Sequence, residues 1–268
     1  MVEPALSSND APTAVRLRGV TKVYDNGTVA LGPLDLDIRK GEFVSLLGSS
    51  GCGKSTALRL IAGLIAPSAG TLDVAARSSG HAIGFVFQEP TLMPWSTIRE
   101  NVRLPLKLAH MPDAQSTARV DEVLAQVGLA DFAGAYPREL SGGMKMRASL
   151  ARALVTEPDI LLMDEPFAAL DEITRFRLNN DLLALWRELG KTVIFVTHSV
   201  FESVYLSQRV VVMTSRPGRV SAECHIESSE PRDDAFRTSM AYAGYCRDVS
   251  QALMTASDAA FNETKARA

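Results

Sequence analysis

The stretch from Gly48 to Thr56 constrains this chain more than any other, because it matches the pattern Gly-x-x-x-x-Gly-Lys-Ser/Thr. An apolar run, Phe43 to Leu47, precedes it and predicts a buried strand. The apolar residues that follow are spaced as on one side of a helix: Ala57, Leu58, Leu60, Ile61 and Leu64. Glycines allow backbone N–H groups to curl around phosphate oxygens. The strand, loop and helix together therefore predict a nucleotide site, whereas an ordinary Gly/Ser loop is the alternative.

Two side chains of this loop have expected roles. Lys54 places a point charge on the β- and γ-phosphates, and Ser55 offers a hydroxyl to Mg²⁺. We expect the whole loop to contact the nucleotide, through Gly48, Ser49, Ser50, Gly51, Cys52, Gly53, Lys54, Ser55 and Thr56. Because Cys52 stands beside Lys54 and a helix N-terminus, we also expect it to react faster with alkylating reagents than Cys224 or Cys246.

Composition excludes several classes of protein. At 268 residues, with 46% hydrophobic and 22% charged residues, the chain is long enough for one large domain or two small ones. The net charge of −3 gives no support to nucleic-acid binding. No apolar run approaches the roughly 20 residues of a membrane helix, and no signal peptide is visible. Three scattered cysteines suit a reducing cytoplasm, so we expect a cytoplasmic protein that meets a membrane only through a partner.

Hydrophobic periodicity and turn residues divide the chain into elements. A polar tail is expected over residues 1–14 and a helical, alanine-rich extension over residues 233–268. Strand-like runs disappear between residues 89 and 158, which predicts a helical insertion, and a further helix is expected over residues 173–189. The predicted strands cover residues 15–24, 34–38, 43–47, 71–74, 83–87, 160–164, 192–197, 210–213 and 220–226.

A second group of polar residues ends buried strands. Asp164 and Glu165 follow an apolar run, and because successive strand residues face opposite ways they cannot share one task. One carboxylate can hold Mg²⁺, while the other acts at the γ-phosphate and on an attacking water. Gln88 and His198 each end another strand, at the edge where open α/β sheets bind ligands. The alternatives are a merely solvated acidic pair and structural hydrogen-bonding roles for Gln88 and His198.

A second glycine-rich helix start lies about 90 positions after the first. Ser141 is a good N-cap, and Gly142 and Gly143 expose backbone N–H groups at a positive helix end. This arrangement predicts a second anion site, although a plain capped helix start would have the same sequence. Tyr24 is an aromatic residue that can stack on a base or simply pack.

Taken together, these motifs resemble the ATP-binding subunit of an ABC transporter. In that family's terms, residues 48–56 form the Walker A loop, Gln88 the Q-loop and residues 140–144 the signature motif. Residues 160–165 form Walker B, Ala169-Leu170-Asp171 the D-loop, and His198 the switch histidine; Tyr24 stands where the adenine-stacking aromatic does. The resemblance covers residues 15–226. It implies an α/β fold with a P-loop NTPase (RecA-like) core, an N-terminal antiparallel β portion and a helical insertion, within an ATPase domain at residues 15–232.

A narrower resemblance is to the ATPases of nitrate/sulfonate/taurine-type importers. It rests on residues 87–95, on Met144, and on the stretch Ser-Arg-Pro-Gly-Arg at residues 215–219. Met144 replaces a glutamine usual in the wider family, and Ser199 stands where an aspartate is commoner. Neither departure touches the residues expected to hold phosphate. They therefore bear on the rate of ATP hydrolysis and not on the assignment as an ATPase.

The resemblance implies an ATPase that uses ATP and Mg²⁺, with Glu165, His198 and Gln88 at the catalytic centre and Ser55, Gln88 and Asp164 around the metal. It implies a dimer of two copies closed over two ATP molecules, each bound between one subunit's Walker loops and the other's Ser141 and Gly143. Permease subunits would hold this dimer at the cytoplasmic face of the inner membrane, and a periplasmic or lipoprotein solute-binding protein would act indirectly. A soluble P-loop kinase and a non-transport ABC ATPase are the competing classes.

Overall fold

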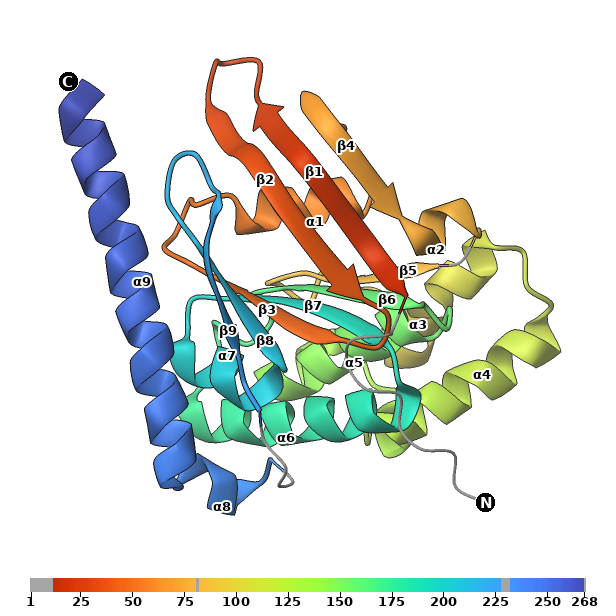
Figure 1. Cartoon of the computed structure of the whole chain (residues 1–268). Helices are drawn as coiled ribbons and strands as arrows, with labels where there is room; N and C mark the ends of the chain where they lie inside the picture. The colour runs from red at the N-terminus through yellow and green to blue at the C-terminus, as the bar shows by residue number, and fades with distance from the viewer. Residues whose placement is uncertain (1–11, 81, 228–231, 268) are drawn as a thin grey trace, which may run out of the picture. The chain divides into compact units, whose positions relative to one another are not determined.

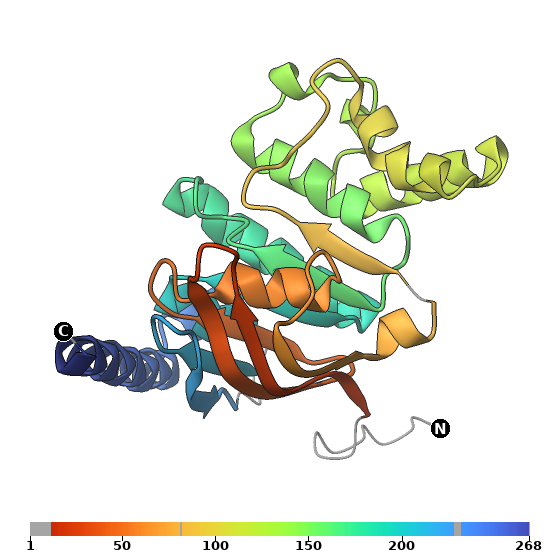
Figure 2. The same cartoon turned by 90° about the horizontal axis from the view of Figure 1, so that it is seen from above.

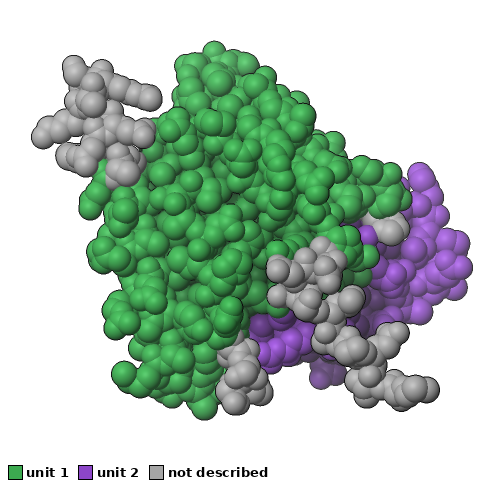
Figure 3. All heavy atoms as spheres, in the orientation of Figure 1, with its two compact units in different colours: residues 1–80, 190–268 green, residues 81–189 purple. Residues whose placement is uncertain are grey.

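The computed structural model describes residues 12–80, 82–227 and 232–267. These residues form two compact units, one made of residues 1–80 and 190–268 and the other of residues 81–189 (Figure 3). The tail expected over residues 1–14 falls mostly outside the described part of the chain.

The first unit begins with a small antiparallel sheet whose strand order is β2-β1-β4 (Figure 1). Its strands are β1 (Thr13–Val23), β2 (Val29–Arg39) and β4 (Ala69–Val74). β2 starts five residues before the predicted strand, although Gly32 and Pro33 look like a strand end. The pairing with β1 continues past them through Lys22 and Leu31, with register shifts that absorb the irregular backbone.

A mostly parallel layer lies in the same unit, with strand order β7-β3-β8-β9. The strands are β3 (Phe43–Leu47), β7 (Thr192–Thr197), β8 (Arg209–Met213) and β9 (Val220–His225). β3 pairs in parallel with β7 and β8, whereas β9 runs antiparallel to β8. Every residue of β3, β7 and β8 is buried, as expected for a sheet covered on both faces.

The helices of this unit are α1 (Lys54–Ile61), α2 (Ala75–Ser78), α7 (Val200–Leu206), α8 (Asp234–Arg237) and α9 (Met240–Arg267). α1 contacts β2 and β7, and α9 runs along α7, β8 and β9 (Figure 2). The Tyr242 hydroxyl fastens α9 to α7 by donating to the carbonyl of Phe201 at 3.0 Å.

The second unit contains a parallel strand pair and the whole of the helical insertion. Its elements are β5 (Ile83–Val86), α3 (Ile98–Leu108), α4 (Asp113–Gln126), η1 (Ala130–Phe132), η2 (Pro137–Glu139), α5 (Gly142–Leu154), β6 (Ile160–Asp164) and α6 (Glu172–Leu189). α3 packs on α4 and α5 and starts with a capping box between Thr97 and Glu100. Among the described residues, no helix is both long enough and apolar enough to cross a bilayer.

Candidate functional site

The phosphate loop connects β3 to α1, and two of its glycines adopt a backbone that other residues rarely do. Gly51 has φ +76° and Gly53 has φ +94°. A Cβ on Gly53 would lie 2.6 Å from the carbonyl oxygen of Ala30 and 2.6 Å from Cδ2 of Leu31. Only glycine fits there without displacing the neighbouring strand β2.

Lys54 folds back over its own loop. Its side chain is buried, and Nζ donates to the carbonyl oxygens of Gly48 at 2.8 Å and Ser49 at 3.0 Å. The backbone N–H groups of Gly51 and Gly53 donate to no residue that the structure describes. The loop therefore presents amide donors around a positive side chain, which is the arrangement an anionic phosphate requires.

Cys52 departs from the sequence-based expectation. Its side chain is 0% exposed. Burial raises the pKa of the Cys52 thiol, and the charge of nearby Lys54 opposes this shift to a smaller extent. Burial thus opposes the fast alkylation expected from the sequence, because it outweighs the local electrostatics that favour the thiolate.

Tyr24 lies beside the phosphate loop. Its hydroxyl and that of Thr56 are 3.3 Å apart, and Nζ of Lys22 lies 5.6 Å from the centre of the Tyr24 ring. Tyr24 is half-buried, so part of its ring is available to a base.

His198 follows β7 at the same sheet edge as the phosphate loop. Leu47 and Thr197 are register partners in the β3–β7 pair, so the next residues, Gly48 and His198, emerge side by side. His198 is exposed, and Ser199 is the N-cap of α7, its hydroxyl accepting from the N–H of Glu202 at 3.3 Å. The serine that departs from the family pattern thus has a structural role.

In the second unit, the acidic pair follows β6. Asp164 and Glu165 are half-buried, and Glu165 has φ +46°, a conformation that costs a non-glycine residue on the order of 1–3 kcal/mol. Because Val86 pairs with Met163 across β5 and β6, the strand continuations bring Gln88 and Glu165 to one edge. This sheet edge therefore combines an amide and two carboxylates.

The glycine-rich helix start has the predicted cap. The Ser141 hydroxyl accepts from the N–H of Met144 at 3.3 Å, and Ser141 is exposed at the N-terminus of α5. A Cβ on Gly143 would lie 2.7 Å from Cγ2 of Thr174 in α6. Asp171 accepts from the N–H of Thr174 at 2.9 Å. Hydrogen bonds from the side chain and then the backbone of Thr174 lower the pKa of the Asp171 carboxyl. The signature and D-loop segments therefore pack against one another in this unit.

Sequence reasoning missed Arg152, which anchors the segment after Gln88. From α5, its guanidinium donates to the carbonyls of Pro90 and Thr91 and to the Thr91 hydroxyl, each at 2.8 Å. Burial lowers the pKa of the Arg152 guanidinium. No local signal links residues some 60 positions apart, so this contact could not be read from the sequence.

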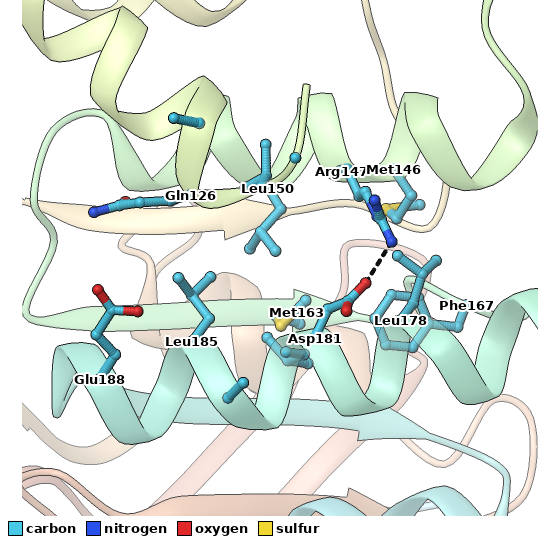
Figure 4. A pocket seen from close by; sticks show the side chains of 15 residues that line it. Gln126, Met146, Arg147, Leu150, Met163, Phe167, Leu178, Asp181, Leu185 and Glu188 are labelled. Atoms are coloured by element: carbon cyan, nitrogen blue, oxygen red, sulfur yellow. Dashed lines mark hydrogen bonds and ion pairs between the residues drawn. The ribbon is translucent and has the colours of Figure 1, made fainter. Parts of the chain in front are cut away.

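A cavity of about 280 Å³ also lies in the second unit, among the end of α4, α5, β6 and α6 (Figure 4). Its walls are largely apolar, and an ion pair joins Arg147 to Asp181 at 2.5 Å beside it. None of the predicted nucleotide, metal or catalytic residues lines this cavity.

The expected metal donors are Ser55 in the first unit and Gln88 and Asp164 in the second. They supply hydroxyl, amide and carboxylate oxygens, which are the hard ligands that Mg²⁺ prefers. Within the described ranges, no three His, Cys, Asp or Glu residues converge as a metal cage.

Several known proteins are similar to this chain in sequence. The family model described as ABC transporter matches residues 31–168, so the chain belongs to the ABC transporter family of ATP-binding proteins. An aliphatic sulfonates import ATP-binding protein of Streptomyces avermitilis is 46% identical over 229 residues, covering 85% of this chain and 83% of the relative. A taurine import ATP-binding protein of Jannaschia sp. is 41% identical over 234 residues, covering 83% and 86%.

A solved ATP-binding cassette is similar in three dimensions. That cassette is a dimer in a post-hydrolysis state with ADP and Pi bound; it matches with a TM-score of 0.70 and 36% identity, over 80% of this chain and 99% of the cassette. The P-loop α/β fold and the ABC ATPase identity inferred from the motifs are therefore confirmed. The chain is an ATP-hydrolysing ABC subunit.

Proposed function

We propose that this chain powers the import of a small solute of the nitrate/sulfonate/taurine class through membrane permease subunits. The observation that carries the proposal is the 41–46% identity, over more than four-fifths of the chain, to ATP-binding proteins named for taurine and sulfonate import. The chain would be peripheral at the cytoplasmic face of the cell membrane, with a solute-binding protein acting indirectly from outside.

The proposed roles follow from the chemistry of each side chain. Lys54 and the loop amides bind the phosphates, and Tyr24 stacks on the adenine. Mg²⁺, held by Ser55, Gln88 and Asp164, would neutralise charge on the phosphates. Glu165 accepts hydrogen bonds from the attacking water and polarises it, and His198 contacts the terminal phosphate.

A second copy of the chain completes each site in this proposal. The dimeric form of the solved ATP-binding cassette supports it. Ser141 and Gly143 of one copy bind the γ-phosphate held by the other copy's phosphate loop. ATP then favours the closed dimer, because only the closed state offers both sets of donors to that phosphate. Hydrolysis removes the shared ligand and reopens the dimer.

The test is reconstitution of the full transporter in vesicles. The chain should co-purify with integral permease subunits, and its ATPase activity should rise when solute-binding protein is added with taurine, an alkanesulfonate or nitrate. Lys54→Ala in the same complex is the matched control and should abolish the stimulated activity. Co-purification with ribosomes, or phosphate transfer to a soluble acceptor without permease, would contradict the proposal.

A further inference from the structure

The stretch from Ser215 to Arg219 has no role in the function proposed so far. It forms most of the connection between β8 and β9 in the first unit (Figure 1). Its sequence combines two arginines with a proline and a glycine.

The backbone of this connection is hydrogen-bonded to strand β2 and lies directly against the phosphate loop. The N–H of Gly218 donates to the carbonyl of Ala30 at 3.0 Å, and its own carbonyl accepts from the N–H of Gly32 at 3.1 Å. A Cβ on Gly218 would lie 2.0 Å from the carbonyl oxygen of Cys52, so the two chain segments touch directly. Any residue larger than glycine would push the connection away from the phosphate loop.

Hydrogen bonds also fix the shape of the connection. The Thr214 hydroxyl donates to the carbonyl of Pro217 and accepts from the N–H of Arg219, both at 3.1 Å. Nε of Arg219 donates to the carbonyl of Gly32 at 2.6 Å. Arg219 is therefore a structural residue, and the turn holds the position of Arg216 between these anchors.

Arg216 points its guanidinium at the phosphate loop. Its Nη2 and Nε lie 3.6 and 4.0 Å from the place that a Cβ on Gly51 would occupy. Its side chain is exposed, and in the described part of the chain it forms no ion pair with a carboxylate. Arg216 also has φ +43°, an unfavourable backbone for a non-glycine residue, which the anchored turn maintains.

We infer that Arg216 is a second nucleotide-binding cation, which contacts phosphate oxygens of the nucleotide from the outer side of the phosphate loop. The inference rests on the proposed nucleotide site and extends it. Lys54 supplies a buried point charge within the loop, whereas Arg216 supplies a planar group able to contact two oxygens at once. Because glycine at position 51 has no side chain, nothing on that residue separates the guanidinium from a bound anion.

The experiment measures MgATP and MgADP affinity of the isolated chain, at a concentration low enough to keep it monomeric. Arg216→Gln should bind MgATP about three- to tenfold more weakly, as expected for one partly exposed charge-assisted contact, and the deficit should shrink in high salt. Arg216→Lys should recover part of the loss. Arg247→Gln is the matched control. The Arg247 side chain is 81% exposed and forms an ion pair with neighbouring Asp248, and the substitution changes the net charge equally.

Two results would overturn the inference. Affinity of Arg216→Gln within twofold of the unmodified chain would exclude the contact, and an equal loss in Arg247→Gln would reduce the effect to net charge. Lys54→Ala separates this question from the proposed function. If Lys54→Ala loses MgATP binding while Arg216→Gln retains it, only the role of Arg216 fails; if Lys54→Ala also binds normally, the nucleotide site itself is misplaced. Unchanged thermal unfolding of Arg216→Gln would show that the variant is folded.

Discussion

Replacing Gly53 by alanine should damage both the stability and the nucleotide affinity of this protein. Gly53 has φ +94°, and a new Cβ would lie 2.6 Å from both the Ala30 carbonyl oxygen and Cδ2 of Leu31. The variant therefore combines backbone strain with steric overlap, and the two contributions can be separated with a second glycine.

Gly190 is that control. It has φ +59°, is exposed, and a Cβ there would have no neighbour within 4 Å. Left-handed strain costs alanine about 1–2 kcal/mol, and the lower entropy of its unfolded chain returns about 0.4–1 kcal/mol. Gly190→Ala should thus lower the free energy of unfolding by about 0.5–1 kcal/mol. The overlap at Gly53 adds about 1–3 kcal/mol, which predicts a loss of about 1.5–4 kcal/mol for Gly53→Ala.

The assay is urea unfolding of both variants, followed by MgATP binding in the absence of urea. Gly53→Ala should unfold at a clearly lower urea concentration and lose most of its nucleotide affinity, because the Cβ displaces either the loop or strand β2. Gly190→Ala should keep normal affinity. Equal destabilisation of the two variants, or normal MgATP binding by folded Gly53→Ala, would refute the reasoning.

Two further predictions concern Glu165 and the cysteines. Glu165→Gln keeps the shape of the side chain and removes its charge, so ATP should still bind while turnover falls by roughly 10²–10⁴; near-normal turnover would move the general base elsewhere, with His198 the next candidate. In alkylation followed by mass spectrometry, Cys224 should be labelled first, because it is partly exposed whereas Cys52 and Cys246 are buried and burial raises the pKa of all three thiols. Faster labelling of Cys52 than of Cys224 in the folded protein would contradict the burial argument.

Most of the fold could be predicted from local pattern. The buried strands read as continuous apolar runs, and the phosphate loop requires glycine at the positions where φ is positive. The early start of β2 could not be predicted, because it depends on pairing with β1 across Gly32 and Pro33. In that strand, tertiary pairing overrides residues that locally favour a break.

The candidate site was predictable where one short segment carries the chemistry. Contacts between distant segments could not be predicted. Arg152 contacts a loop about 60 positions away in the chain, and Arg216 lies beside a loop about 165 positions away. Cys52 shows the converse case, since its sequence neighbours favour the thiolate whereas its burial favours the neutral thiol. The sequence therefore predicts which residue types belong to the candidate site. It does not predict which other segments contact these residues or bury them.

The central claim is that each ATP is shared between two copies of the chain, and mixing two defective copies tests it most directly. Lys54→Ala removes the phosphate-loop side, and Ser141→Arg blocks the signature side. With Glu165→Gln added to both chains to slow reopening, nucleotide trapped in closed dimers is counted.

Random mixing makes half of the dimers mixed, and each mixed dimer has one intact and one doubly defective site, so about a quarter of all sites should be whole. We predict that the mixture traps nucleotide at about this fraction, while each variant alone traps almost none. A mixture that traps no more ATP than either variant alone would contradict the shared-site account.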